Sequence, residues 1–160
     1  MTLEIRPFTA ADWPAVWAII QEVIRARETF PYDPDMSSAE ARDVWASGRT
    51  MVAVLSGKVL GTAKMGPNRG GPGAHIATAS FMVAASARGQ GVGTGLCREA
   101  ISWARHEGYA GMQFNAVVAT NTAAVSLYER EGFEVIGTVP RAFEHPAHGR
   151  VGLHVMFMEF

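Results

Sequence analysis

The chain has 160 residues, of which 48% are hydrophobic and 18% are charged, and its formal net charge is −1. This length and composition predict one domain over residues 1–160, with a core that needs no metal or disulfide. The near-neutral charge argues against nucleic acid or a membrane surface as a partner. The single Cys97 excludes an internal disulfide, and its position in a predicted helix favours packing over nucleophilic chemistry. With no membrane-spanning stretch and no signal-like start, we expect a cytoplasmic protein.

Hydrophobic periodicity and turn residues predict an alternation of helices and strands. Apolar residues recur at helical spacing from Trp13 to Ile24, and Thr9 or Asp12 can begin this helix. Glycines end several of the predicted segments, as Gly108 does after the third helix. In chain order we predict a strand at 3–6, a helix at 13–24, a helix from 37 or 38 to 48, a hairpin of strands at 50–55 and 59–63, a strand at 75–83, a helix from the glycine-rich loop to about 107, a strand at 112–118, a helix from 121, and strands at 134–139 and 151–158.

Residues 88–94, with the sequence RGQGVGT, join an apolar strand to a helix. Glycine lets the backbone approach a phosphate closely, and the N–H groups at a helix start point toward such an anion. The partial positive charge of the helix end and the guanidinium of Arg88 favour the same ligand. This order of strand, glycine-rich turn and helix predicts a pyrophosphate site, with a turn that binds no ligand as the alternative.

The common nucleotide loops do not fit this segment. A Walker loop ends in Lys-Ser/Thr, and no lysine follows Lys64 in the chain. The glycines are also out of register with the Gly-x-Gly-x-x-Gly of a dinucleotide-binding turn. Instead, Arg88-x-x-Gly91-x-Gly93 resembles the acetyl-CoA loop of the GCN5-related N-acetyltransferase (GNAT) superfamily, whose pattern is Gln/Arg-x-x-Gly-x-Gly/Ala.

A second segment resembles the other CoA-contacting motif of that superfamily. Asn121 precedes a short predicted helix, Tyr128 lies on it, and Gly132-Phe133 stands at its end. Both motifs occur in the expected order within residues 61–138. The resemblance implies an α/β (α+β) fold with a mixed, mostly antiparallel sheet of about six or seven strands, flanked by about four helices. It also implies an N-acetyltransferase that uses acetyl-CoA and no metal.

The resemblance further implies which residues bind CoA. The loop binds the pyrophosphate, and the backbone of the preceding strand binds the pantetheine arm and polarises the thioester carbonyl through an N–H group. The implied cofactor-binding residues are Phe81, Met82, Val83, Arg88, Gly89, Gln90, Gly91, Val92, Gly93, Thr94, Asn121, Ser126 and Tyr128.

Tyr128 is the predicted general acid, because a phenol stays protonated at neutral pH and can donate to a thiolate leaving group. Asn121 is expected to bind the pantetheine amide, although helix capping alone would explain an asparagine there. The general base is open, since neither 75–83 nor 112–118 contains a carboxylate. His75 is a candidate, directly or through water, because imidazole titrates near neutrality. Three further candidates are Glu144, His145 and His148; deprotonation by water or binding of a neutral amine is equally open.

The acceptor side resembles a branch that includes proline-analogue N-acetyltransferases. In that branch two asparagines lie six residues apart at the central strand, as Asn115 and Asn121 do here. A third asparagine on the preceding strand is replaced here by Thr78, which speaks against proline analogues because a hydroxyl has a shorter reach and no amide donor. We expect Thr78 and Asn115 to line the amine pocket; otherwise the pocket lies near Phe30, Tyr32 and the 145–148 loop.

The predicted function is transfer of an acetyl group from acetyl-CoA to the primary or secondary amine of a small molecule, by direct attack in a ternary complex. An amino acid, a proline analogue or a xenobiotic amine would be the acceptor. Family habit favours a homodimer, with the strand at 151–158 as its edge. Alternatives are a protein N-acetyltransferase, a CoA-binding regulatory module without turnover, and a nucleotide-binding or phosphotransfer protein.

Overall fold

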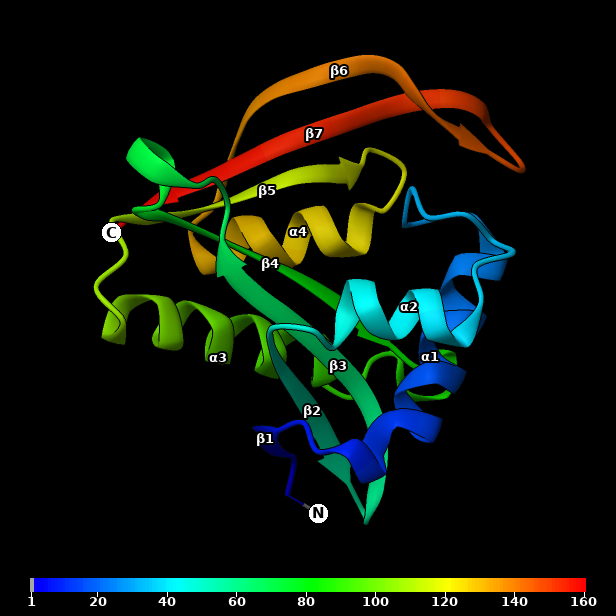
Figure 1. Cartoon of the computed structure of the whole chain (residues 1–160). Coiled ribbons are helices and arrows are strands. Elements are labelled where there is room, and N and C mark those ends of the chain that lie inside the picture. Colours follow the sequence, from blue (N-terminus) through cyan, green and yellow to red (C-terminus); the bar gives the residue numbers. More distant parts are fainter. Residues whose placement is uncertain (1) are drawn as a thin grey trace.

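The computed structural model describes residues 2–160, which form one mixed sheet with helices on both faces (Figure 1). The sheet order is β1-β2-β3-β4-β5-β7-β6, and every neighbouring pair is antiparallel except β4 with β5. The seven strands and four α-helices of this part confirm the predicted fold class. The strands are β1 (Glu4–Pro7), β2 (Arg49–Leu55), β3 (Lys58–Pro67), β4 (Ile76–Val83), β5 (Gly111–Val118), β6 (Glu134–His145) and β7 (Gly149–Glu159), and the helices are α1 (Trp13–Ala26), α2 (Ser38–Trp45), α3 (Val92–His106) and α4 (Thr122–Glu131).

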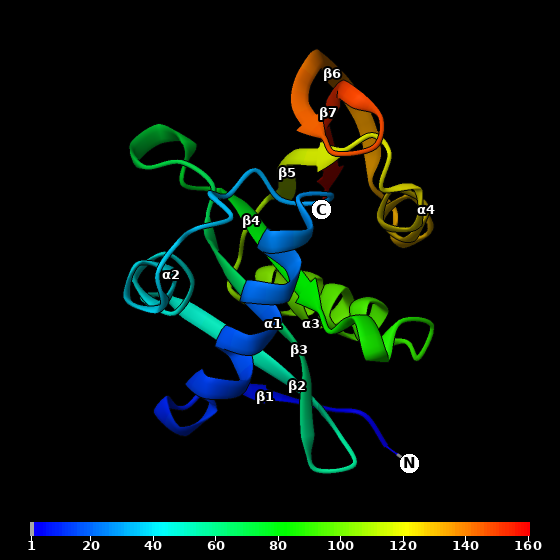
Figure 2. The same ribbon diagram turned by 90° about the vertical axis from the view of Figure 1, so that its right-hand side faces the viewer.

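The sheet separates two hydrophobic clusters (Figure 2). On one face α3 and α4 cover the sheet, and Leu96 packs with Met112 and Phe114 there. On the other face α1 and α2 cover it, and Trp45 packs with Met82. Because neighbouring strand residues face opposite sides, β4 contributes to both clusters.

The C-terminal strands differ from the prediction in length and in order. β6 was predicted to end at residue 139 but continues to His145, and it forms a long hairpin with β7. Pro140 and the positive φ of Arg141 interrupt the strand pattern there, and the β6–β7 register shifts between Val139 and Phe143. β7 lies between β5 and β6, so the predicted edge at 151–158 is wrong and β6 is the edge strand.

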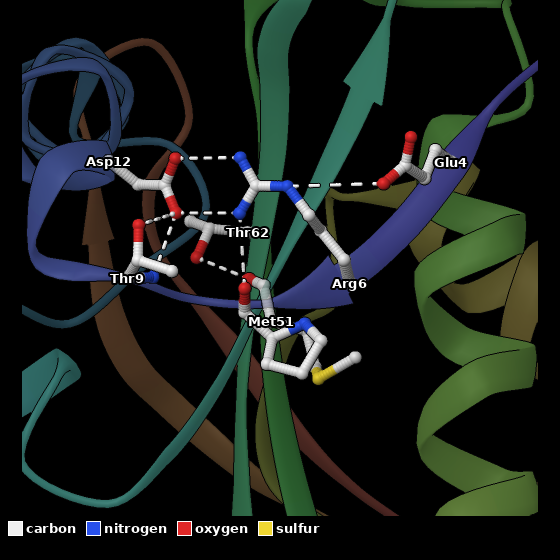
Figure 3. Close-up of polar contacts among 7 residues, drawn as sticks. Glu4, Arg6, Thr9, Asp12, Met51 and Thr62 are labelled. Carbon is white, nitrogen blue, oxygen red and sulfur yellow. Dashed lines mark hydrogen bonds and ion pairs between the residues drawn. The ribbon is translucent and has the colours of Figure 1, made fainter.

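Two buried polar groups tie the N-terminal half together (Figure 3). The guanidinium of Arg6 donates from both terminal nitrogens to the Asp12 carboxylate, at 2.8 and 2.9 Å, and the backbone N–H of Thr9 donates to the same carboxylate. In the core, the hydroxyl of the fully buried Thr62 accepts from the indole N–H of Trp45 and donates to a backbone carbonyl of β2. The first network joins β1 to the start of α1, and the second joins α2 to the sheet.

The Arg6–Asp12 pair gives the first testable prediction. The hydrogen bonds from Arg6 hold the pKa of the Asp12 carboxyl down at about 2. A lowered folded-state pKa stabilises the fold above the unfolded pKa near 4, and this contribution is lost as the pH falls toward 2. Because Arg6 is partly exposed, we expect the Arg6–Asp12 pair to contribute about 1–2 kcal/mol to the free energy of unfolding at pH 7, less than the full linkage value.

The measurement is the free energy of unfolding of wild type and Asp12→Asn between pH 7 and pH 2. The variant should be less stable at pH 7, and the gap should close as the pH falls. Asp43→Asn, an exposed carboxylate on α2, serves as the control. A gap that stays constant down to pH 2 would contradict the assignment.

Candidate active site

The parallel pair β4–β5 ends after only two register positions. Ile76 pairs with Gly111 and Ala77 with Met112, and beyond them the two strands diverge toward their C-terminal ends (Figure 1). The strands before and after the glycine-rich loop therefore splay apart. Backbone groups along the diverging part of β4 therefore lack a strand partner on one side.

The hydrogen-bond pattern of β3 and β4 shows which backbone groups face the gap, by which we mean the region between the diverging parts of β4 and β5. The N–H of Ala84 donates to the carbonyl of Leu60 in β3 at 2.9 Å, and the carbonyl of Ile76 accepts the N–H of Asn68, just after β3, at 2.8 Å. The β3–β4 register does not shift between these two bonds. In an antiparallel pair such bonds fall on alternate residues. The even-numbered residues of β4, including Met82, thus bond to β3, whereas Phe81 and Val83 direct N–H and C=O toward the gap. Of the three predicted strand residues, only these two can offer backbone donors there.

Aromatic rings fill the start of the gap on the α3/α4 face. The Tyr128 ring of α4 lies 4.5 Å from Phe114 of β5 and 6.1 Å from Phe81 of β4, measured between ring centroids. Phe133, just after α4, stacks on Phe114 at 4.3 Å. The Gly132-Phe133 end of the second motif thus holds Tyr128 against both diverging strands.

The Tyr128 hydroxyl suits a proton donor. It makes no hydrogen bond to a residue that the structure describes, and it is not among the fully buried polar atoms without a partner. Burial of the side chain raises the pKa of Tyr128 above its usual value near 10, so the phenol keeps its proton at neutral pH. Burial also raises the pKa of the Cys97 thiol to about 12, which fits the predicted packing role of that residue.

The glycine-rich loop presents unpaired N–H groups at the start of α3. Gly91 is the N-cap with φ of 80°, and no side chain caps the helix. The N–H of Gly95 donates to the carbonyl of Gly91 at 2.9 Å. In the described chain the backbone N–H groups of Val92, Gly93 and Thr94 have no hydrogen-bond partner. The loop residues Arg88, Gly89 and Gln90 are exposed, and Gly89 also has a positive φ of 77°. The segment can therefore hold a pyrophosphate without any rearrangement of hydrogen bonds.

The loop also lies beside the gap. A Cβ added to Gly93 would contact Val83 of β4 at 3.8 Å and Leu127 of α4 at 3.6 Å. Asn121 caps α4 by accepting the N–H of Ala124 at 3.3 Å, while its Nδ2 binds no described residue. Ser126 lies on the exposed face of α4. The predicted cofactor residues of the loop, of β4 and of α4 therefore surround one region.

The opposite face of the gap is polar. Asn115 accepts from the side-chain amide of Gln113 at 2.9 Å and donates to Asn68 at 2.7 Å. Asn115 lies in a bulge of β5 between Phe114 and Val117. Thr78 lies on the same face, and it directly follows Ala77, which forms the last β4–β5 pair. Sequence reasoning missed Asn68, since its contact with Asn115 spans 47 residues and leaves no local pattern.

The structure does not bring the predicted bases to Tyr128. His75 is exposed just before β4, and its carbonyl accepts from Ala110 N–H at 2.8 Å. Six residues of extended chain separate it from Phe81, roughly 20 Å. His75 therefore lies at the opposite end of β4 from Phe81, and its role as a base stays a prediction.

Glu144, His145 and His148 lie at the tip of the β6–β7 hairpin. A cavity of about 480 Å³ lies there between the hairpin and Arg27 at the end of α1. Arg150, on the same hairpin, bonds to Glu144 at 3.1 Å, and it is six β7 residues from Met156, the partner of Phe114. These groups therefore lie at the open end of the gap, away from Tyr128.

Residues 16–133 match the acetyltransferase (GNAT) family. The chain belongs to this family. It is an enzyme of the N-acetyltransferase class. A GCN5-related N-acetyltransferase from Kribbella flavida is 55% identical, with a TM-score of 0.96 over 99% of this chain and 98% of the other. A ribosomal-protein-alanine N-acetyltransferase from Brucella melitensis is 28% identical, with a TM-score of 0.83 over 98% and 99%. An L-methionine sulfoximine/L-methionine sulfone acetyltransferase of Pseudomonas paraeruginosa is 28% identical, over 88% of this chain and 86% of the other.

The glycine-rich loop gives the second prediction. Gly91→Val places a β-branched residue at φ of 80°, where only glycine is comfortable, and so displaces the N–H groups of the loop. The rise in melting temperature that CoA and acetyl-CoA cause in wild type should be lost, whereas pantetheine without the nucleotide should raise it little in either protein.

Gly57→Val is the matched control, because Gly57 has a similar φ of 76° and open space around it in the β2–β3 turn. It should lose a similar amount of stability but keep the CoA response. A folded Gly91→Val variant with unchanged CoA affinity would reject the loop as the pyrophosphate site.

Proposed function

We propose that this enzyme transfers the acetyl group of acetyl-CoA to the amine of a small molecule in a ternary complex. The observation that carries the proposal is the chemical difference between the two faces of the β4–β5 gap. Tyr128 and its aromatic neighbours occupy one face, and the amides of Asn115 and Asn68 occupy the other. A thioester bound along the free edge of β4 would meet a proton donor on one side and an acceptor amine on the other.

The cofactor residues divide the binding work. The N–H groups at the start of α3 and the Arg88 guanidinium would hold the pyrophosphate, and the free Nδ2 of Asn121 would donate to the pantetheine arm. The N–H of Phe81 or Val83 would donate to the thioester carbonyl, where negative charge develops during attack.

The proton balance follows from the residues present. The amine nitrogen forms a bond to the carbonyl carbon, the carbon–sulfur bond breaks, and Tyr128 gives its proton to the departing sulfur. The nitrogen loses one proton to water as the amide forms, and the Tyr128 phenolate takes one proton back from water. The strands β4 and β5 contain no carboxylate. The proposed acceptor binds as a neutral amine or loses its proton to water, with His75, Glu144, His145 and His148 as the predicted alternatives for a base.

The residues of the amine side favour a small polar acceptor. Asn115, Asn68 and Thr78 offer hydrogen bonds close to the start of the gap, and Arg27 and Arg150 line the cavity at its open end. Arg150 is paired with Glu144, whereas the Arg27 guanidinium has no carboxylate partner in the described chain and favours an acceptor that also carries a carboxylate. The Pseudomonas relative is named for acting on amino acid analogues, which supports a free amino acid or a similar compound.

A coupled thiol-release assay over amino acids, imino acids, polyamines, xenobiotic amines and peptides with a free N-terminus tests the proposal. Turnover of a small amine supports it. Turnover of peptides alone would instead support protein N-acetylation, the activity named for the Brucella neighbour. CoA binding without any turnover would indicate a regulatory module.

We also infer a homodimer, formed through β6 rather than through the strand predicted from sequence. β6 is the edge strand, and it carries three large exposed hydrophobic side chains: Val135, Ile136 and Val139. An exposed apolar edge favours pairing with another strand. Light scattering gives the mass in solution, and a monomer at micromolar concentration would reject the inference.

The third prediction concerns the leaving group. Tyr128→Phe keeps the ring that packs on Phe114 and removes only the proton that the thiolate needs. General acid catalysis contributes about 10²–10⁴-fold, so kcat should fall by that order while acetyl-CoA affinity changes little. Tyr109→Phe, in the segment between α3 and β5 and beside Trp103, is the control. Turnover of Tyr128→Phe at the wild-type rate would leave Tyr128 a packing residue.

The fourth prediction concerns the acceptor pocket. Asn115→Ala and Thr78→Val each remove a hydrogen-bonding group, which should lower kcat/KM for the amine roughly tenfold and leave acetyl-CoA affinity unchanged. Thr138→Val, which removes an exposed hydroxyl on β6, is the control. Wild-type kinetics in both pocket variants would move the pocket to Phe30, Tyr32 and the hairpin tip.

A further inference from the structure

A single hydrogen bond joins α1 to the start of the glycine-rich loop. The side chain of Glu22 accepts the backbone N–H of Ala85 at 2.8 Å, across 63 residues of sequence. Ala85 is the first residue of a short 3₁₀ helix, Ala85–Ala87, that connects β4 to the loop. Neither partner belongs to the motifs that resemble CoA-binding segments.

The Glu22–Ala85 hydrogen bond supplies the N-terminal side-chain cap that the 3₁₀ helix lacks. Its N-cap residue, Ala84, has no side chain that could accept a hydrogen bond, so the carboxylate of Glu22 caps the helix from another element. The helix and the loop then follow by local bonds: Ala87 N–H to Ala84, Arg88 N–H to Ala85, and Gln90 N–H to Ala87. In residues 2–160, no other element outside β4 and α3 makes a hydrogen bond to residues 85–91.

Packing gives little support at the same place. A cavity of about 490 Å³ separates α1 from the β2–β3 turn, and both Glu22 and Ala84 line it. The α1 residues on this side include Ala15 and Ala18, whose short side chains leave the space unfilled. The longer Glu22 side chain crosses to the loop where its neighbours on α1 do not.

We propose that Glu22 is a positioning residue for the acetyl-CoA loop. By holding the first N–H of the 3₁₀ helix, it fixes the direction in which the chain enters Arg88–Thr94, so that the loop is ordered before the cofactor binds. The proposal rests on the proposed function of that loop. It extends the cofactor site to α1, which otherwise covers the opposite face of the sheet.

Because Glu22 is charged, its effect on the order of the loop can be separated from its direct electrostatic effect on the ligand. A carboxylate near a pyrophosphate site repels the ligand, so removal of the charge alone should strengthen cofactor binding. Removal of the hydrogen-bond acceptor should weaken it, because the loop must then be ordered at the expense of binding free energy. The two effects have opposite signs, and Glu22→Gln separates them by keeping an acceptor oxygen without the charge.

The experiment measures CoA and acetyl-CoA dissociation constants by calorimetry for wild type, Glu22→Ala and Glu22→Gln, with Glu28→Ala as a control for loss of an exposed carboxylate near the end of α1. Loss of a helix cap predicts roughly fivefold weaker binding for Glu22→Ala. Glu22→Gln and Glu28→Ala should bind as wild type or slightly tighter. Amide hydrogen exchange of the ligand-free protein should become faster at Ala85–Arg88 in Glu22→Ala only, and the acceptor KM should not change.

Each outcome bears on the proposal. Equal affinities and equal exchange rates in Glu22→Ala and wild type would overturn it, as would tighter binding by both Glu22 variants. If wild type itself does not bind CoA, the proposed function fails instead. Slower exchange in wild type without an effect on affinity would reduce Glu22 to a structural cap.

Discussion

The site depends on where the hydrogen bonds between β4 and β5 stop. Two register pairs hold the strands together, and the next residues of β4 keep partners only on the β3 side. Had the parallel pairing continued, the N–H groups of Phe81 and Val83 would bond to β5 and no ligand could reach them. The early end of the β4–β5 pairing thus leaves the N–H groups of Phe81 and Val83 without a strand partner.

Close helix packing places the glycine-rich loop beside the same end of β4. A Cβ on Gly61 of β3 would lie 2.6 Å from a methyl carbon of Val92, the first residue of α3. Glycine at this position therefore lets the start of α3 rest directly on the sheet, one strand away from the gap. Ala77 and Ala79 of β4 face the same cluster with similarly short side chains. Small residues in the sheet, as much as the loop itself, therefore fix the position of the start of α3 against the sheet.

Local sequence patterns predicted the elements and the cofactor motifs, whereas long-range contacts escaped them. The helix that begins at Asn121 and ends at Gly132 was predicted because capping residues leave a local signature. The length of β6 was not predicted, because Pro140 and a bulge interrupt the alternating pattern of a strand and resemble a turn. The partners of Asn115 and Ala85 lie 47 and 63 residues away, at positions that no periodicity relates. The position of His75 was predicted correctly, just before β4, and its role as a base stays a prediction.

The absence of a base on β4 and β5 gives Tyr128 a clear place in the reaction. A residue that exchanged protons in both directions would need a pKa near neutrality, as imidazole has. Burial raises the pKa of Tyr128 instead, so the phenol enters the reaction protonated, and after it donates it must take a proton back from water. In the proposed mechanism the acceptor amine arrives neutral or loses its proton to water. Selection among amines by their own basicity follows from this arrangement, together with selection by the polar face of the gap.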